Sequence, residues 1–270
     1  MKSHTDRRYL LTDQYRNSGN VTRRFDLHEQ CSVNPYGWHP WVFDQFEFPP
    51  DARILELGSG PAYLWAKNAD RIHSGWRLVL SDFSKGMISD ARTHLAQVER
   101  AFRFATVDAQ AIPFQNSAFD AVIANHMLYH VPDLATALAE VHRVLKSSGT
   151  LYATTNGMTH LKELGDLVRG FDPDYTPHSG AAHFGLEDGR DQLSPWFADI
   201  TLSRYDDALE ISDAGVLKAW ARSWAESVFG KGRMDDLLNY LEHELESQGS
   251  IHVTKDSGLF TARKGSGGRL

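Results

Sequence analysis

Cysteine is nearly absent from this sequence, because Cys31 is the single one among 270 residues. One cysteine cannot form a disulfide within the chain, and a metal site built on several thiolates is disfavoured with it. Long apolar runs are lacking too, since stretches such as Ala121–Ala124 are far too short to span a bilayer. Met1–Arg8 is polar and charged, without the apolar core of a secretory signal. We therefore expect a cytoplasmic protein with no membrane partner.

Positive charge is also in short supply. Lys and Arg number 28 against 35 Asp and Glu, which gives a formal net charge of -7 with neutral histidines. This balance argues against a broad surface that binds phosphates, so we expect no nucleic-acid partner. A small-molecule partner is expected instead, and a homo-oligomer is compatible with the sequence.

Short apolar segments alternate with helical patterns through the middle of the chain. The strands are expected at 53–57, 77–81, 102–107, 119–124, 150–154, 200–205 and within 251–262. Helices at 62–71, 85–97 and 134–145 separate the first five strands, which is typical of a parallel sheet built from βαβ units. The sequence predicts an α/β fold: a doubly wound, Rossmann-like sheet of seven mostly parallel strands, with helices on both faces and helical cap insertions.

The domain organisation follows from where this alternation begins and loosens. Residues 1–50 are expected to form a helical, aromatic cap segment, and residues 51–263 the α/β domain. Helical insertions are expected at about 157–198 and 212–249, and residues 264–270 as a flexible tail. Since ligands bind beyond the carboxyl ends of parallel strands, these insertions are expected to enclose a substrate pocket there.

A glycine-rich turn follows the first strand. Glu56 lies near the end of that strand, Gly58 and Gly60 follow, and Ala62 begins the next helix. Glycines let the backbone turn sharply and approach a ligand closely. A single turn of this kind is weak evidence, because it also fits a dinucleotide-binding protein.

Three further features follow in order along the chain. The second strand ends in Asp82, whose carboxylate is suited to two ribose hydroxyls. The third strand ends in Asp108, and the fourth ends in Asn125 before a segment rich in histidine and aromatic residues. Together, over about residues 53–155, these motifs resemble those of the class I S-adenosylmethionine-dependent methyltransferases of small-molecule type. Ala62 departs from the family pattern, which has a third glycine there.

The resemblance implies S-adenosylmethionine as cofactor and assigns roles to particular positions. Glu56, Gly58 and Gly60 would line its methionine moiety, and Asp82 would bind the ribose. The adenine would contact Phe83, Met87, Asp108 and Ala109, and Asn125 would face the amino-acid end.

Candidates for the chemistry and for the acceptor come from two other places. His126, Tyr129 and His130 follow the fourth strand, and histidine has the right ordinary pKa for a base near neutrality. We expect these three to be catalytic and to bind no metal, because no third ligand lies at a suitable spacing. The substrate-binding candidates combine aromatic faces with polar tips: Tyr15, Arg23, His28, Tyr36, Trp38, Trp41 and His183.

The sequence therefore predicts methyl transfer to O, N or C of a small apolar or aromatic metabolite. Two alternatives stay open: an NAD(P)-dependent oxidoreductase, and a cofactor-binding protein with a methyltransferase fold and no turnover. A reductase shares the glycine turn and Asp82 but does not require Asp108.

Calorimetric titration with S-adenosylmethionine, S-adenosylhomocysteine and NADH separates the two enzyme classes. We expect micromolar binding of the first two and none of NADH. Binding of NADH alone would overturn the functional prediction and leave the fold prediction in place.

Overall fold

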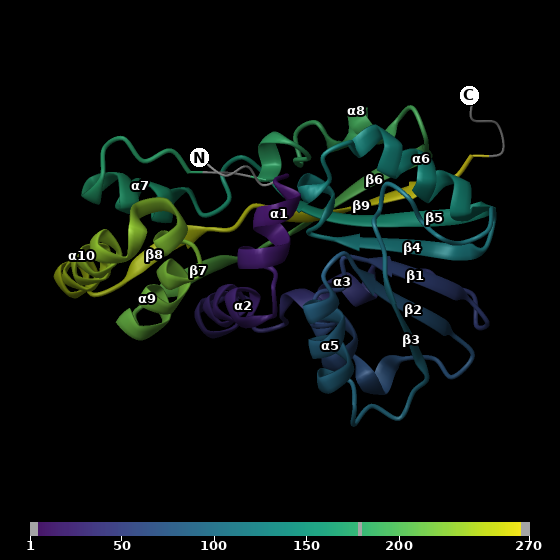
Figure 1. The fold of residues 1–270 in the computed structure, drawn as a ribbon, viewed down its shortest axis with the longest axis horizontal. Coiled ribbons are helices and arrows are strands. Elements are labelled where there is room, and N and C mark those ends of the chain that lie inside the picture. The colour runs from purple at the N-terminus through teal and green to yellow at the C-terminus, as the bar shows by residue number, and fades with distance from the viewer. Residues whose placement is uncertain (1–4, 178–179, 266–270) are drawn as a thin grey trace.

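The computed structural model describes residues 5–177 and 180–265. A seven-stranded sheet runs through one half of the molecule (Figure 1). Its strand order is β3-β2-β1-β4-β5-β9-β6, and β9 is antiparallel to both β5 and β6 while the other neighbours are parallel. The strands are β1 (Arg53–Leu57), β2 (Arg77–Asp82), β3 (Phe102–Thr106), β4 (Phe119–Asn125), β5 (Leu145–Asn156), β6 (Ala198–Tyr205) and β9 (Ser257–Arg263). The predicted seven-stranded, mostly parallel sheet is confirmed.

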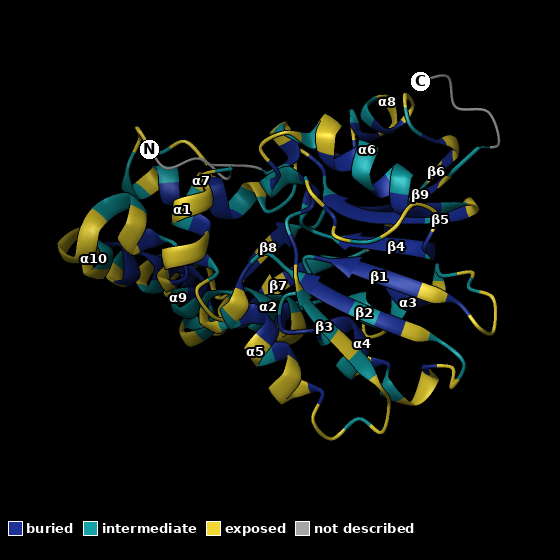
Figure 2. Cartoon of the chain, turned by 45° about the vertical axis from the view of Figure 1, so that its right-hand side comes forward, coloured by how far each residue is buried: buried dark blue, intermediate teal, exposed yellow. Residues whose placement is uncertain are grey.

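Both faces of the sheet are covered, which explains why its central strands are buried along nearly their whole length (Figure 2). Ile54 points into a core with α3 (Trp38–Asp44), α4 (Tyr63–Lys67) and α5 (Lys85–His94). Leu55, the next residue along β1, points into the opposite core with α6 (Leu134–Val144) and α8 (Gly189–Leu193). Because side chains alternate between faces along a strand, continuous apolar strands of this kind fit a sheet covered on both sides.

Besides the cores on the two faces of the sheet, a further core lies beyond the carboxyl ends of the parallel strands. We call this region the cap lobe: α2 (Gly19–Cys31), α7 (Lys162–Phe171), β7 (Ala208–Ile211), α9 (Ala214–Arg222), α10 (Ala225–Gln248) and β8 (Ile251–Thr254). Helix α2, from the start of the chain, lies against α9 and β7 (Figure 1). Leu27 of α2 is fully buried among Leu217, Leu241 and Val253 of the later segments. Cys31 is a buried free thiol in this core.

The remaining elements are short. They are α1 (Arg7–Tyr9), the π-helical turn η1 (Leu10–Gln14) and the 3-10 turns η2 (Ala69–Arg71), η3 (Leu128–His130) and η4 (Gly180–Ala182). Among the described residues, no helix combines the length and the apolar character needed to cross a membrane.

Three sequence expectations need correction. The single strand expected within 251–262 is two strands, because Lys255 and Asp256 separate β8 in the cap lobe from β9 in the main sheet. β7 was not anticipated, since it pairs with β8 across about forty residues of intervening chain. Lys264 is fixed, not flexible: its ammonium donates to the carbonyls of His142 (2.5 Å) and Leu145 (2.8 Å). The rest of the expected tail, 266–270, lies outside the described residues.

The cap lobe should depend on its own core for stability. Leu241 has no exposed surface, so Leu241→Ala is expected to cost about 2–5 kcal/mol of unfolding free energy through lost burial and a cavity. Chemical denaturation followed by circular dichroism measures this. Val33→Ala, at a position 53% exposed, is the matched control and should change stability by about 0.5 kcal/mol or less. Equal effects of the two substitutions would contradict this account of the cap lobe.

Candidate functional site

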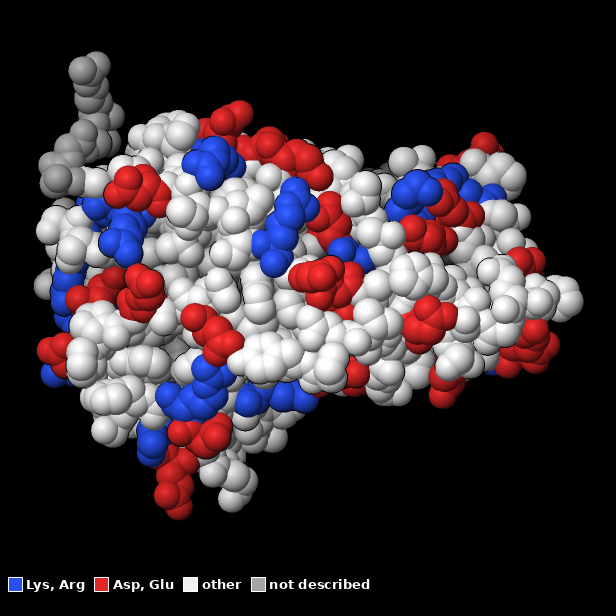
Figure 3. Space-filling view, turned by 180° about the vertical axis from the view of Figure 1, so that it is seen from behind, with Lys and Arg blue, Asp and Glu red and all other residues white. Residues whose placement is uncertain are grey.

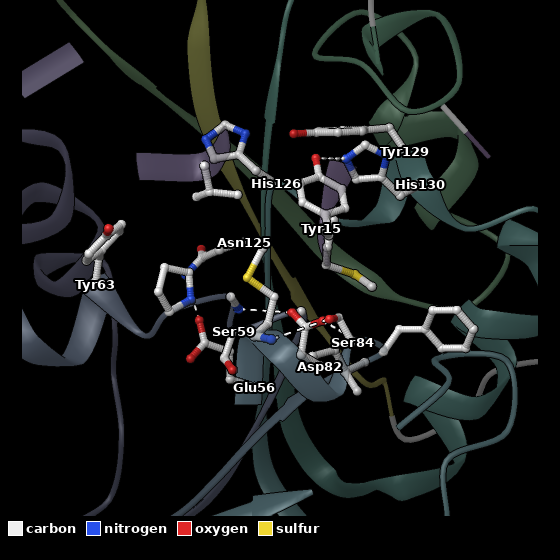
Figure 4. A pocket seen from close by; sticks show the side chains of 18 of the residues that line it. Tyr15, Glu56, Ser59, Tyr63, Asp82, Ser84, Asn125, His126, Tyr129 and His130 are labelled. Carbon is white, nitrogen blue, oxygen red and sulfur yellow. Dashed lines mark hydrogen bonds between the residues drawn. The ribbon is translucent and has the colours of Figure 1, made fainter. Parts of the chain in front are cut away.

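A cavity of about 470 Å³ lies between the sheet's carboxyl edge and the cap lobe. One end is formed by the turns that follow β1, β2, β3 and β4, and the other by α2, η3 and the β8–β9 turn. Figure 4 shows Glu56 and Asp82 at the first end and Tyr15, Tyr129 and His130 at the second, with Asn125 between them.

The glycine turn after β1 is held in left-handed conformations. Gly58 and Gly60 have φ values of 64° and 52°, and Ala62 has a φ of 63°. A Cβ at Gly58 would lie 2.7 Å from the Met127 Cβ, so both the backbone angle and the close approach require glycine there. Ala62 keeps the left-handed angle of the family's glycine, at a cost of about 1–2 kcal/mol. At Gly60 nothing lies within 4 Å of the position of a Cβ, so this part of the turn, which we call the cradle, is suited to a ligand that lies close to the main chain.

Asp82 connects this cradle to β2. One carboxylate oxygen accepts from the Gly60 N–H at 3.0 Å, and the other from the Ser84 N–H at 2.7 Å. Burial raises the pKa of Asp82 to about 6, although these hydrogen bonds favour the charged form. Asp82 is therefore a desolvated acceptor on the cavity wall, as ribose hydroxyls require.

Glu56 is the second buried carboxylate of this end, with an exposed fraction of 1%. It accepts from the Trp65 indole N–H at 2.6 Å and from the Asn125 amide at 3.1 Å. Burial raises its pKa to about 7, and the nearby Asp82 adds to the rise. An ammonium or sulfonium brought into the cavity would offset the cost of this buried negative charge.

The remaining predicted cofactor residues lie on the same wall. Phe83, Met87, Asp108 and Ala109 all line the cavity. Asp108 is paired with Arg7 at 2.8 Å, and the Arg7 guanidinium also lies over the Phe83 ring, 4.5 Å from its centre. Burial would raise the pKa of Asp108, but hydrogen bonds from Gln110 and the Arg7 charge hold it below its ordinary value. α1 thus covers this part of the cavity.

At the opposite end, the Tyr15 hydroxyl is 2.7 Å from His130 Nε2, and the Tyr129 ring lies 4.5 Å from the His130 ring. Burial raises the pKa of Tyr15 and of Tyr129, so both phenols stay protonated at neutral pH. Tyr15 and the three predicted catalytic residues line one cavity together with the cofactor candidates.

His126 occupies a strained position at the end of β4. Its φ is 47°, and its N–H donates to the Thr154 side-chain oxygen at 3.0 Å. Burial and the Lys255 charge lower the pKa of His126 to about 4, so its imidazole is neutral at pH 7. Strain of this kind in a non-glycine residue is typical of functional sites.

The predicted substrate residues divide into two groups. Tyr15, His28 and Trp38 line the cavity, and Trp38 lies 5.2 Å from the His126 ring. The other four do not line the cavity. Trp41 packs against Trp38 and Tyr205, and the His183 ring donates to the Val131 carbonyl at 2.8 Å. Arg23 and Tyr36 are exposed, and they form hydrogen bonds with Asn20 and Asp44 respectively. These contacts give the four a role in packing or at the surface in place of the predicted substrate contact.

Sequence reasoning missed several lining residues. Arg24 and Phe25 share a face of α2 with Val21 and His28, a spacing of three and four residues that marks one helix side. That periodicity was available as a signal. His39, Tyr63, Asn156, His160 and Lys255 also line the cavity, and no local motif indicates them.

Comparison with known proteins agrees with this geometry. Residues 55–153 match a family model described as a methyltransferase domain. The predicted similarity to S-adenosylmethionine-dependent methyltransferases is confirmed over this segment, which is a little over a third of the chain.

Curated relatives match a little under half of this chain. The ubiquinone/menaquinone biosynthesis C-methyltransferase of Xanthomonas oryzae is 29% identical over 133 residues, 48% of this chain and 53% of that protein. The malonyl-[acyl-carrier protein] O-methyltransferase of Legionella pneumophila is 33% identical over 112 residues, 42% of this chain and 39% of that protein. The chain therefore spans about half the length of these curated relatives or less.

Solved structures extend the likeness to the fold. A Haemonchus contortus phosphoethanolamine N-methyltransferase superposes with a TM-score of 0.59 over 98% of this chain and 61% of that one. At 19% sequence identity this likeness shows the shared fold alone.

The two raised carboxylate pKa values predict how cofactor binding depends on pH. Below about pH 7 Glu56 is protonated, and below about pH 6 Asp82 is too, so the charged forms that favour a cation and ribose hydroxyls are lost as pH falls. We expect S-adenosylmethionine affinity to drop by about tenfold per pH unit below 7, and more steeply below 6. Calorimetry between pH 5 and pH 8 measures this.

Glu56→Gln is the matched control, because glutamine keeps the size of the side chain and an oxygen that accepts hydrogen bonds, but has no carboxyl group to titrate. In this variant only the step near pH 6, from Asp82, should persist. An affinity that is constant across the range in the parent protein would show that these carboxylates do not contact the cofactor.

Proposed function

We propose that this protein transfers the methyl group of S-adenosylmethionine to an O, N or C atom of a small metabolite with an apolar or aromatic body. The observation that carries the proposal is the continuity of one cavity from the Gly58–Gly60 cradle and Asp82 to Tyr15, His126 and His130. Such a cavity brings a cofactor and an acceptor face to face.

The residues present fit this cofactor. The turn leaves room for a ligand against the main chain at Gly60, and two buried carboxylates lack a cationic partner among the residues that the structure describes. Glu56 with Asn125 would hold the methionine end, Asp82 the ribose, and Phe83, Met87, Asp108 and Ala109 the adenine. Bound S-adenosylmethionine supplies a methyl group on a positively charged sulfonium, which is already electrophilic.

The chain's own contribution is alignment, exclusion of water and removal of a proton. Trp38, Tyr129 and the Tyr15–His130 pair surround the acceptor end and fix the orientation of a bound molecule. His126 is an unprotonated imidazole at neutral pH, so it can accept the proton that an acceptor atom loses as its bond to the methyl carbon forms. Its left-handed backbone supports the assignment, because the strain is explained if the ring must point into the cavity.

Surface charge supports a small acceptor over a nucleic acid. In the view of Figure 3, basic and acidic side chains are interspersed, and no continuous basic tract crosses that face. Several basic side chains of the described residues are paired with acids, as in Arg71–Asp44 and Arg204–Asp256. Together with a net charge of -7, this supports a substrate that enters a cavity.

Methyl transfer is tested with methyl-labelled S-adenosylmethionine and fractionated small-molecule extracts. We expect a labelled product whose mass exceeds that of its precursor by one methylene group. His126→Asn keeps a residue that tolerates the left-handed backbone but removes the base, so it should lower turnover by about 100-fold. Binding of S-adenosylhomocysteine should stay unchanged in this variant.

His73→Asn is the control, because His73 is exposed and lies outside the cavity. Full turnover in His126→Asn would remove it as the base. Tight cofactor binding with no labelled product from any fraction would instead favour a cofactor-binding protein without turnover.

A further inference from the structure

The acceptor end of the cavity has a distinct chemical character. We call it the acceptor chamber and define it by Arg24, His28, His126, Asn156, His160 and Lys255, all of which line the cavity. These residues come from α2, from the ends of β4 and β5, and from the β8–β9 turn. The hydrogen bonds that these side chains already form determine which donors and acceptors they present to the cavity.

His160 is a fixed hydrogen-bond donor. Its Nδ1 accepts from the Asp256 backbone N–H at 3.2 Å, so Nδ1 carries no proton. The proton of the neutral ring is therefore on Nε2, which has no partner among the described residues. Burial, together with the neighbouring His126 and Lys255, lowers the pKa of His160 to about 3, in agreement with a neutral ring. His28 lies parallel to this ring at 5.7 Å.

Asn156 presents donors as well. Its side-chain oxygen accepts from the Ser257 hydroxyl at 2.8 Å, and its amide NH₂ has no acceptor among the residues described. Because Asn156 lines the cavity, this NH₂ can donate to a ligand bound there.

Two cations complete the chamber. The Lys255 side chain is only 5% exposed, and its ammonium pairs with the buried Asp207, which is not on the cavity wall. The Arg24 guanidinium lies over the Tyr15 ring, 5.6 Å from its centre, and has no carboxylate partner within the described part of the chain. An arginine without an acidic partner beside a cavity is suited to an anion.

Three of the four acids that line the cavity, Glu56, Asp82 and Asp108, belong to the cofactor end. The fourth, Glu29, follows His28 on α2 beside the chamber, and its carboxylate is paired with the Lys67 ammonium at 2.5 Å. After burial, the charges that lower the pKa of His28 are all basic: Lys255, His160, His126 and Arg24. The two ends thus have opposite character, with carboxylates for a cationic cofactor and donors for a partner that accepts hydrogen bonds.

We propose that the methyl acceptor carries a carboxylate, which the acceptor chamber binds through Arg24, Lys255 and the N–H donors of His160 and Asn156. The carboxylate anchors one end of the molecule while its apolar or aromatic body lies toward His126 and the cofactor. This proposal rests on the proposed function and names the class of its substrate.

Matched acid and amide pairs test the proposal: benzoate with benzamide, cinnamate with cinnamamide, and hexanoate with hexanamide. Binding is measured by calorimetry and ligand-observed NMR on the full chain saturated with S-adenosylhomocysteine. Because hydrogen bonds to charged groups are the strong ones, at least one acid should bind about tenfold more tightly than its amide. Arg24→Met should lower that preference by about tenfold, and His160→Phe should lower it too while keeping an aromatic ring.

Arg23→Met is the control, since Arg23 is the neighbouring residue of α2, carries the same charge and faces solvent. It should leave the preference for the acid unchanged. The proposal is overturned if every acid binds no better than its amide up to about 10 mM, or if Arg23→Met and Arg24→Met behave alike. If the parent protein does not bind S-adenosylhomocysteine, the proposed function itself is contradicted. This binding is measured in a separate titration without the acids and amides.

Discussion

The Asp207 carboxylate is the point on which the arrangement of the two parts of the molecule depends. It accepts from the Ser32 hydroxyl at 2.8 Å, from the Asn34 N–H at 3.1 Å and from the Ala208 N–H at 2.8 Å, and it pairs with the Lys255 ammonium. It therefore joins the end of α2, the β6–β7 connection and the β8–β9 turn. Since a buried charge left without its partner costs about 3–5 kcal/mol, this junction fixes the cap lobe over the sheet and Lys255 on the cavity wall.

The site is also where the fold tolerates backbone strain. Ala62 and His126 adopt left-handed conformations that glycine would adopt without cost, and both flank the place where β1 and β4 end. Their neighbours compensate: Ala62 accepts the first helical bond of α4, and the His126 N–H is held by Thr154. The strain persists because buried strands on both sides fix these turns, so stability gained in the sheet offsets a cost at the site.

Most of the sheet could be predicted from the sequence because its strands are local apolar segments with glycine or acidic residues at their ends. The cofactor end could be predicted for the same reason, since Glu56, Asp82, Asp108 and Asn125 each follow a recognisable strand. The acceptor end could not. Arg23 and Arg24 differ by about 100° around α2, and only the packing of Leu27 determines which of them faces the cavity. Lys255 and His160 reach it through long-range pairing that has no local signal.

This difference has a physical consequence for how the enzyme's specificity arises. The cofactor residues lie within or close to the matched segment 55–153, on turns that the parallel sheet positions rigidly. The acceptor chamber draws Arg24, His28, Asn156, His160 and Lys255 from outside that segment. Asn156 ends β5 of the main sheet, whereas α2, which carries Arg24 and His28, is held by the cap-lobe core. Substitutions in the cap lobe can therefore change what is bound without disturbing the cofactor turns. Relatives that share only the first part carry little information about the acceptor, so its chemistry has to be read from the chamber itself.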